Sequence, residues 1–143
     1  MFKKVEGLIT APVVPFNADG SVNYPTIKAY CEKLYRNGVA GAFVNGTTGE
    51  GLSLSIEERM KVAEKWVESA PQGFKIIVHI GHTSIAESMK LAKNAQDIGA
   101  FGIASLPPIF FKPTSVSQLV EHCSLEASAA PNLPYYFYHI PSL

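Results

Sequence analysis

The stretch GAFVNGTTGEGLS, residues 41–53, sets a pattern that recurs along the whole chain. It begins with a short apolar run, GAFVN (41–45), and continues directly into a loop of glycines and hydroxyl side chains, GTTGEGLS (46–53). A short apolar run of this kind is typical of a buried strand, and small residues after it are typical of a loop. The stretch therefore predicts a buried strand whose carboxyl end opens into a loop of small polar residues.

Four further apolar runs repeat the first half of this pattern: GLITAPVVPF (7–16), KIIVHIG (75–81), GIASLPP (102–108) and YYFYHIP (135–141). Successive runs start about 27 to 34 residues apart, which is the length of a strand followed by a crossover helix. The repeat therefore predicts a chain of strand–helix units.

Helical patterns fill the gaps between the runs. A stripe of apolar side chains predicts a first helix that ends at Gly38: Ile27, Tyr30, Cys31, Leu34 and Tyr35. The sequences SIEE (55–58) and SIAE (84–87) read as capping boxes that begin the second and third helices. A fourth helix is expected to begin at Thr114 or Ser115. The predicted order is therefore βαβαβαβαβ.

The runs are too continuously apolar for an antiparallel sheet with one wet face, so they predict parallel strands covered by helices. Two α/β architectures compete, a doubly wound open sheet and part of a (β/α)8 barrel. The doubly wound dinucleotide-binding sheet would need a G-x-G-x-x-G loop, which the sequence lacks. We therefore expect a partial TIM (β/α)8 barrel of about four and a half units, with residues 1–143 as the N-terminal portion of a single domain.

Composition excludes several classes of function. Hydrophobic residues make up 47% and charged residues 17%, and 12 basic side chains balance 12 acidic ones. Without a basic surplus, no nucleic-acid partner is expected, and without an apolar run of about 20 residues no membrane span is expected. The N-terminal segment lacks a signal-peptide cleavage pattern, and Cys31 and Cys123 form no disulfide framework, so we expect a cytoplasmic protein.

The GTTGE loop (46–50) is the first candidate site. Its glycines allow backbone bends and leave amide groups exposed, and the hydroxyls of Thr47 and Thr48 add donors. Together these groups could bind a carboxylate or a phosphate. The alternative is a tight strand-to-helix turn in which the threonines only cap the local backbone.

Tyr138 is the second candidate. Alternation along a strand places Tyr136 and Tyr138 on one face, opposite Tyr135 and Phe137. A tyrosine where a strand ends can move a proton, although an aromatic core residue is the alternative. No carboxylate cluster accompanies the histidines at 79, 82, 122 and 139, so no metal site is expected.

Five segments carry a family resemblance. FVNGTTGEGLSLS (43–55) combined with YHIP (138–141) resembles the pyruvate-dependent class I aldolase superfamily, which includes N-acetylneuraminate lyases and dihydrodipicolinate synthases. The segments 10–24, 80–82 and 109–113 extend the resemblance over the whole chain. It implies a (β/α)8 barrel, assembled as a homotetramer, in which a lysine forms a Schiff base with pyruvate without a metal or organic cofactor.

The resemblance also assigns roles to residues. It implies that Thr47 and Thr48 hold the pyruvate carboxylate and that Tyr138 moves the proton when the carbon–carbon bond breaks or forms. The synthases carry an arginine where this chain has Leu143, and a tyrosine hydroxyl where it has Phe110. These departures favour the sialic acid lyases, which split N-acetylneuraminate into N-acetylmannosamine and pyruvate. Another pyruvate aldolase, such as a synthase-like enzyme, and a non-catalytic half-barrel that binds a partner are the alternatives.

One family residue is missing from the sequence. The Schiff-base lysine lies on the sixth strand of the family, whereas only five strands are expected here. Lys75 begins the third apolar run, at the opposite face of the barrel, and Lys112 lies in a loop with no desolvated site that would make it nucleophilic. We therefore expect residues 1–143 alone to be inactive.

Overall fold

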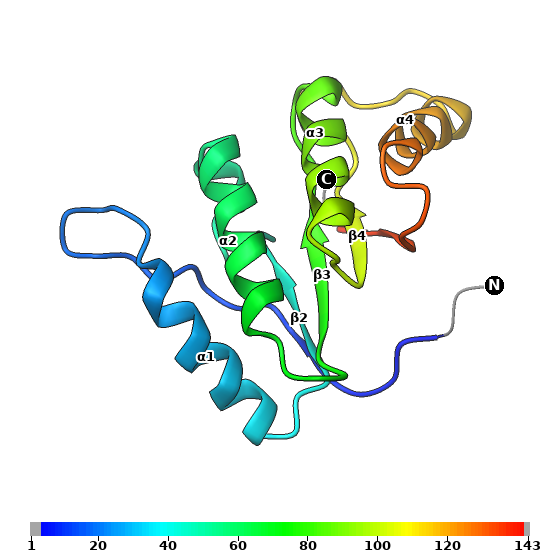
Figure 1. Cartoon of the computed structure of the whole chain (residues 1–143). Helices are drawn as coiled ribbons and strands as arrows, with labels where there is room; N and C mark the ends of the chain where they lie inside the picture. Colours follow the sequence, from blue (N-terminus) through cyan, green and yellow to red (C-terminus); the bar gives the residue numbers. More distant parts are fainter. Residues whose placement is uncertain (1–3, 142–143) are drawn as a thin grey trace.

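A computed structural model describes residues 4–141 (Figure 1). Its strands are β1 (Ile9–Thr10), β2 (Gly41–Val44), β3 (Lys75–His79), β4 (Gly102–Ser105) and β5 (Tyr135–Phe137). Its α-helices are α1 (Tyr24–Arg36), α2 (Ile56–Ser69), α3 (Ile85–Asp97) and α4 (Val116–Ser128), and a short 3-10 helix, η1, covers Gly51–Ser53. The predicted order of strands and helices is confirmed.

The strands form one sheet in the order β1-β2-β3-β4-β5, and every neighbouring pair is parallel. A doubly wound sheet would reverse this order at its switch point, whereas a barrel keeps it. The helices follow one another along the outside of the sheet (Figure 1). The expected partial (β/α)8 barrel is therefore confirmed.

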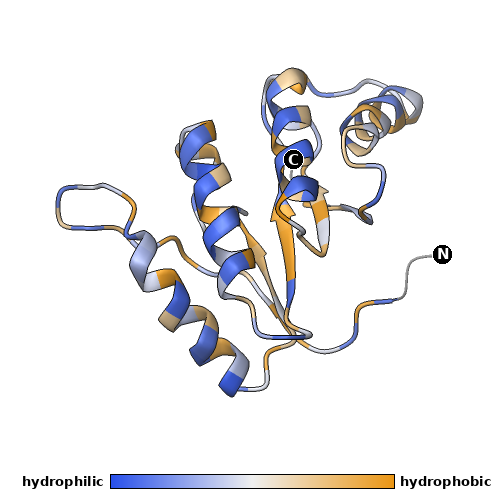
Figure 2. Ribbon diagram, viewed as in Figure 1, coloured by the Kyte–Doolittle hydropathy of each residue, from blue (hydrophilic) through white to orange (hydrophobic). Residues whose placement is uncertain are grey.

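The two faces of the sheet have different neighbours. The face under the helices carries the hydrophobic core, including Val44, Ile76, Val78 and Ile103, and the strands are the most uniformly apolar elements of the ribbon (Figure 2). On the other face the register pairs Phe43 with Ile77 and Ala104 with Tyr136. These four side chains line a common cavity, so this face forms the concave interior that a closed barrel would enclose.

The predicted helix boundaries are mostly confirmed. The side chain of Asn23 caps α1, and Gly38 follows its end with a φ of +77°. Ser55 and Glu58 form both hydrogen bonds of a capping box at the start of α2. Ser115 accepts from the backbone N–H of Gln118 at the start of α4. Local side-chain chemistry therefore fixes where these helices begin or end.

The capping box predicted at 84–87 is wrong. Ser84 is the N-cap residue of α3, but its side chain makes no capping hydrogen bond. Its backbone N–H donates instead to Nδ1 of His82 at 2.9 Å, and the carboxylate of Glu87 pairs with Lys90 at 2.6 Å. In a capping box, the N–H of Ser84 would donate to the carboxylate of Glu87. Here His82 binds that N–H and Lys90 binds that carboxylate.

The first apolar run contributes less strand than its length suggests. Only Ile9–Thr10 pairs with β2, and Phe16, at the end of the run, bridges Val22 in antiparallel fashion. Pro12 and Pro15 interrupt the run, and proline cannot donate to a sheet ladder. Among residues 4–141, no helix has the length and apolar character needed to cross a membrane.

Candidate active site at the carboxyl ends of the strands

The GTTGE loop and Tyr138 lie at the same edge of the sheet. The loop begins directly after β2, and Tyr138 directly follows β5. The backbone N–H of Tyr138 donates to the carbonyl of Ser105 at 2.9 Å, which continues the β4–β5 ladder by one residue. Because all five strands are parallel, their carboxyl ends meet at one edge. The structure therefore brings the two predicted segments to one end of the molecule.

Three aromatic rings meet beneath this edge. The ring of Tyr138 packs edge to face against Phe43, with centroids 5.2 Å apart, and lies 6.3 Å from the ring of His79. Phe43 and His79 are 5.9 Å apart and also perpendicular. Tyr138 shares a cavity of about 440 Å³ with Phe43 and Tyr136 on the concave face. Tyr136 and Tyr138 thus lie on one face of the sheet, as predicted, and that face is the concave one.

Thr47 lines a second cavity of about 200 Å³ at the same edge. The ring of His79 lines this cavity too, together with Glu50, Ser53 and Leu106. His79 therefore stands between the Thr47 cavity and the Tyr138 ring. Thr48 is exposed and lines neither cavity.

The loop glycines serve a purpose other than the one predicted. The two left-handed residues of the loop are Asn45 (φ 59°) and Glu50 (φ 51°), and none of the loop glycines has a positive φ. A Cβ on Gly51 would overlap the carbonyl of Asn45, one on Gly46 would lie 2.9 Å from the Phe43 ring, and one on Gly49 would lie 3.1 Å from the carbonyl of Pro12. The glycines thus permit close approach of the backbone, and the expectation that they provide its bends is wrong.

Arg59 of α2 lies buried beneath the loop and was not among the predicted site residues. Its Nη1 donates to the carbonyl of Gly81 at 3.0 Å, and its Nη2 donates to the carbonyl of His79 at 2.8 Å. The side chain of Asn45 donates to the carbonyl of Arg59 at 2.9 Å. These bonds join the start of the loop, the helix after it and the exit of β3.

Burial sets the charges of this cluster. Burial, together with the neighbouring Arg59, lowers the pKa of His79 to about 3, although a hydrogen bond with the backbone of Asn45 acts in the opposite direction. Burial lowers the pKa of Arg59 to about 10. At neutral pH, Arg59 is therefore a buried cation and His79 a neutral ring. The sequence did contain a signal for the burial of Arg59. It lies four residues before Ala63 and seven before Trp66, on the stripe of α2 that is buried.

A second polar cluster lies on the opposite, helix-facing side of the sheet. Ser105 and Tyr135 both donate to Oε2 of Glu126, which is fully buried on α4, and Nε2 of His122 lies 3.4 Å from Oε1 of Glu126. Burial and the nearby carboxylate raise the pKa of Tyr135. Tyr135 is thus a structural phenol, which separates it from Tyr138 on the concave side.

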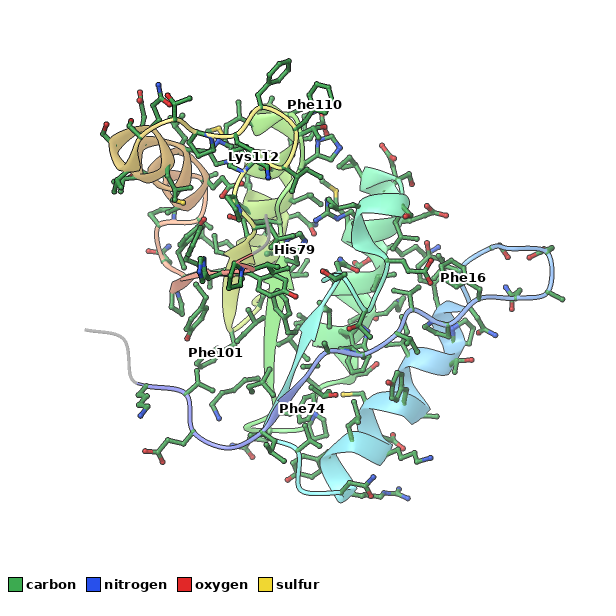
Figure 3. All side chains as sticks on the ribbon, turned by 180° about the vertical axis from the view of Figure 1, so that it is seen from behind. Phe16, Phe74, His79, Phe101, Phe110 and Lys112 are labelled. Carbon is green, nitrogen blue, oxygen red and sulfur yellow. The ribbon has the colours of Figure 1, made fainter. Side chains whose placement is uncertain are left out.

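The lysines considered from the sequence lie away from these groups. Nζ of Lys75 lies 5.9 Å from the ring centroid of Phe101, at the amino end of β3, and Lys112 is exposed. In Figure 3, Phe110 and Lys112 belong to the loop beyond the strand ends, with His79 deeper in the molecule. Phe110 and Phe111 are 78% and 84% exposed, so they form no wall of either cavity. Within residues 4–141, no three His, Cys, Asp or Glu side chains gather as a metal site would require.

Known proteins match the chain over almost its whole length. The model of the dihydrodipicolinate synthetase family matches residues 4–143. The N-acetylneuraminate lyase of Rattus norvegicus is 46% identical over 99% of this chain and 45% of its own. The chain therefore spans about half the length of the curated relatives that it matches.

Solved structures give the same result. The N-acetylneuraminate lyase of Proteus mirabilis superposes with a TM-score of 0.93 at 47% identity, over 96% of this chain and 46% of that one. A dihydrodipicolinate synthase from Aquifex aeolicus superposes with a TM-score of 0.89 at 34% identity, over 96% and 46% of the two chains. The fold is common to both kinds of enzyme, and the identity is higher to the lyase.

Proposed function

Because this chain belongs to the dihydrodipicolinate synthetase family, we propose that it forms part of the active site of a pyruvate-dependent aldolase that cleaves N-acetylneuraminate to N-acetylmannosamine and pyruvate. The observation that carries the proposal is the meeting of the GTTGE loop and Tyr138 at one edge of the sheet, with the ring of His79 between them. A loop that could bind an anion and a phenol at one edge of the sheet suit a 2-keto acid.

The GTTGE loop would bind the carboxylate of the substrate. Thr47 lines a cavity large enough for a carboxylate group. Thr48 is exposed, and its backbone N–H and hydroxyl would bind the same carboxylate. Neutral donors suit this task because they hold an anion without a proton transfer that would neutralise it.

Tyr138 would move the proton. In the cleavage direction, Tyr138 would have to begin the step as a phenolate, whose oxygen takes the proton from the hydroxyl on the carbon that becomes the aldehyde. The electrons of the breaking carbon–carbon bond then flow into an imine formed between the keto carbon and a lysine, which the family resemblance places beyond residues 1–143. The proton returns through Tyr138 when the enamine is protonated. A positioned acid–base group of this kind accelerates a reaction by about 100- to 10,000-fold.

Three observations favour a lyase over a synthase. Identity is 46–47% to the rat and Proteus lyases and 34% to the Aquifex synthase. Phe110 has no hydroxyl to offer a proton relay, and its ring is 78% exposed. The third observation, Leu143 in place of the arginine of the synthases, lies outside the described residues and rests on the sequence alone. We also propose, on the resemblance alone, that the complete protein is a cytoplasmic homotetramer without a metal or organic cofactor.

The test uses the complete protein that contains this chain. Pyruvate release from N-acetylneuraminate is followed with lactate dehydrogenase and NADH, and imine formation is followed by mass spectrometry after borohydride reduction with pyruvate. We expect Tyr138→Phe to lower kcat by about 100-fold or more while the pyruvate adduct still forms. We expect Thr47→Val to raise the pyruvate concentration needed for the adduct by about tenfold, with Tyr35→Phe on the exposed side of α1 as the control.

Each alternative gives its own result. Condensation of pyruvate with aspartate semialdehyde, without cleavage of N-acetylneuraminate, would assign a synthase instead. Absence of any pyruvate adduct in the complete wild-type protein would leave a non-catalytic barrel and end the proposal.

A further inference from the structure

We propose that Arg59 is a positioning residue of this site, and that its buried positive charge is the counter-charge of the substrate carboxylate. The inference rests on the proposed function, since it assigns a partner to the same carboxylate. It goes beyond that function because the loop itself offers only neutral donors, from hydroxyls and backbone amides. Arg59 would supply the full charge that the loop lacks.

The first step of the argument is the cost of the buried cation. Arg59 is 0% exposed. Within residues 4–141, none of the ion pairs includes it. Its partners are carbonyl oxygens and one ring nitrogen, and its Nε has no partner among the described residues. A buried charge without an opposite charge destabilises a fold, and an anion that binds nearby would offset this cost.

The second step is the position of the charge. Nη2 of Arg59 lies 3.4 Å from Nδ1 of His79, and the ring of His79 lines the Thr47 cavity. His79 therefore contacts the guanidinium and also lines the cavity where a carboxylate would bind. Since His79 is held neutral, the ring does not compete for the anion, and the low-dielectric surroundings leave the field of Arg59 poorly screened.

The third step is the mechanical link to the loop. Asn45 begins the loop in a left-handed conformation, and its side chain is tied to the backbone of Arg59. Gly51 closes the loop over the carbonyl of Asn45 so tightly that no Cβ fits. Arg59 also holds both carbonyls at the exit of β3, those of His79 and Gly81. The residue that supplies the charge thus also supports the two segments that line the Thr47 cavity.

A comparison of pyruvate with pyruvamide distinguishes the role of Arg59 as a counter-charge from its role as a support of the loop. Pyruvate and pyruvamide present the same keto group to the Schiff-base lysine, but only pyruvate carries a negative charge. Their apparent affinities are measured by borohydride trapping in the complete protein. The ratio of the two affinities reports recognition of charge, because a change that only loosens the loop weakens both ligands.

We expect Arg59→Met to lower the preference for pyruvate over pyruvamide by about tenfold or more, as the loss of one charge in a poorly screened site predicts, while trapping of pyruvamide changes by less than about threefold. Lys61→Met, two residues away on the exposed side of α2, is the matched control and should leave the ratio unchanged. Equal losses for both ligands, or an unchanged ratio in Arg59→Met, would overturn the proposal and leave Arg59 a structural residue.

Arg59→Lys keeps the test decisive if the methionine variant does not fold. Lysine keeps the charge but loses the two-pronged hydrogen bonding, and burial lowers the pKa of a lysine. We therefore expect the preference of Arg59→Lys for pyruvate to be close to that of wild type at pH 6 and to fall as the pH rises. A ratio that stays as constant with pH as that of wild type would contradict the proposal. Failure of wild type to trap either ligand would instead count against the proposed function itself.

Discussion

The hydroxyl of Tyr135 donates to Oε2 of Glu126 across 3.0 Å and so joins β5 to α4. The adjacent residue, Tyr136, points to the opposite face of the sheet and lines the concave cavity. Two consecutive tyrosines therefore have different tasks, one in the structural layer beneath the helices and the other in the space where the ligand is expected. Replacing each tyrosine in turn therefore compares the helix-facing side of the sheet with its concave side.

Replacing Tyr135 by phenylalanine removes the phenol from a carboxylate that is fully buried. We expect the free energy of unfolding to fall by about 1–3 kcal/mol, because the buried carboxyl group of Glu126 would lose a hydrogen bond without gaining water. Tyr136→Phe should cost less than about 0.5 kcal/mol, since among the described residues its hydroxyl has no hydrogen-bond partner. Thermal melting of the complete protein compares the two, and equal shifts would show that the Glu126 cluster contributes no stability.

Acid sensitivity should depend on His79. Its pKa is about 3 in the folded protein, against an ordinary value of 6.5. As the pH falls from about 6.5 towards 3, the unfolded chain therefore binds a proton at this position that the folded chain does not. The free energy of unfolding falls over this window, by about 2 kcal/mol between pH 7 and pH 5, and the contribution is complete above pH 6.5.

A non-titrating side chain should flatten this dependence. We expect the melting temperature of His79→Gln to decrease less steeply than that of wild type between pH 7 and pH 5, although the variant starts from a lower value. His139→Gln, at an exposed position, is the control and should follow the wild-type curve. If His79→Gln follows the wild-type slope as well, the imidazole is protonated in the folded protein and its assignment as a neutral ring is wrong.

The sheet and its helices could be predicted because their signals are local and repeated. Apolar runs about 30 residues apart specify strand–helix units, and the cap at Ser55 is written in four consecutive residues. The same local rule failed at Ser84, where His82 and Lys90 bind the groups that a capping box would use. The capping rule considers only the first and fourth residues of the motif, whereas in the structure other nearby side chains can bind the same polar groups.

The burial of two charged side chains is not predicted by residue type. Arg59 and Glu126 are charged residues, which are usually exposed, and each lies on an otherwise apolar helical stripe. Their burial depends on partners 20 and 21 residues away in sequence, His79 and Ser105. The roles of Thr47, Thr48 and Tyr138 came from family resemblance and remain predictions, although the structure brings their segments to one edge.

The loop glycines predict a graded series of alanine variants. Gly51→Ala places a methyl group onto the carbonyl of Asn45, whereas Gly49→Ala meets the carbonyl of Pro12 at 3.1 Å and needs only a small shift. We expect Gly51→Ala to cost about 1–3 kcal/mol or more and to weaken pyruvate trapping strongly, because overpacking displaces the backbone of the loop. Gly49→Ala should retain most of both properties. Similar losses in Gly51→Ala and Gly49→Ala would contradict the close-approach explanation.

The absent nucleophile predicts the behaviour of residues 1–143 expressed as a separate polypeptide. The exposed Lys112 and the amino-end Lys75 line neither the Thr47 cavity nor the Tyr138 cavity, and a lysine becomes nucleophilic near neutral pH only in a desolvated or charge-tuned site. We therefore expect incubation with pyruvate and borohydride to add no stoichiometric mass to this polypeptide, while the complete protein gains one reduced pyruvate per chain. Circular dichroism of the same sample shows whether the polypeptide is folded when it is tested. A stoichiometric adduct that peptide mapping places on Lys112 would show that this chain carries its own Schiff-base lysine, and the division of the active site proposed above would then be wrong.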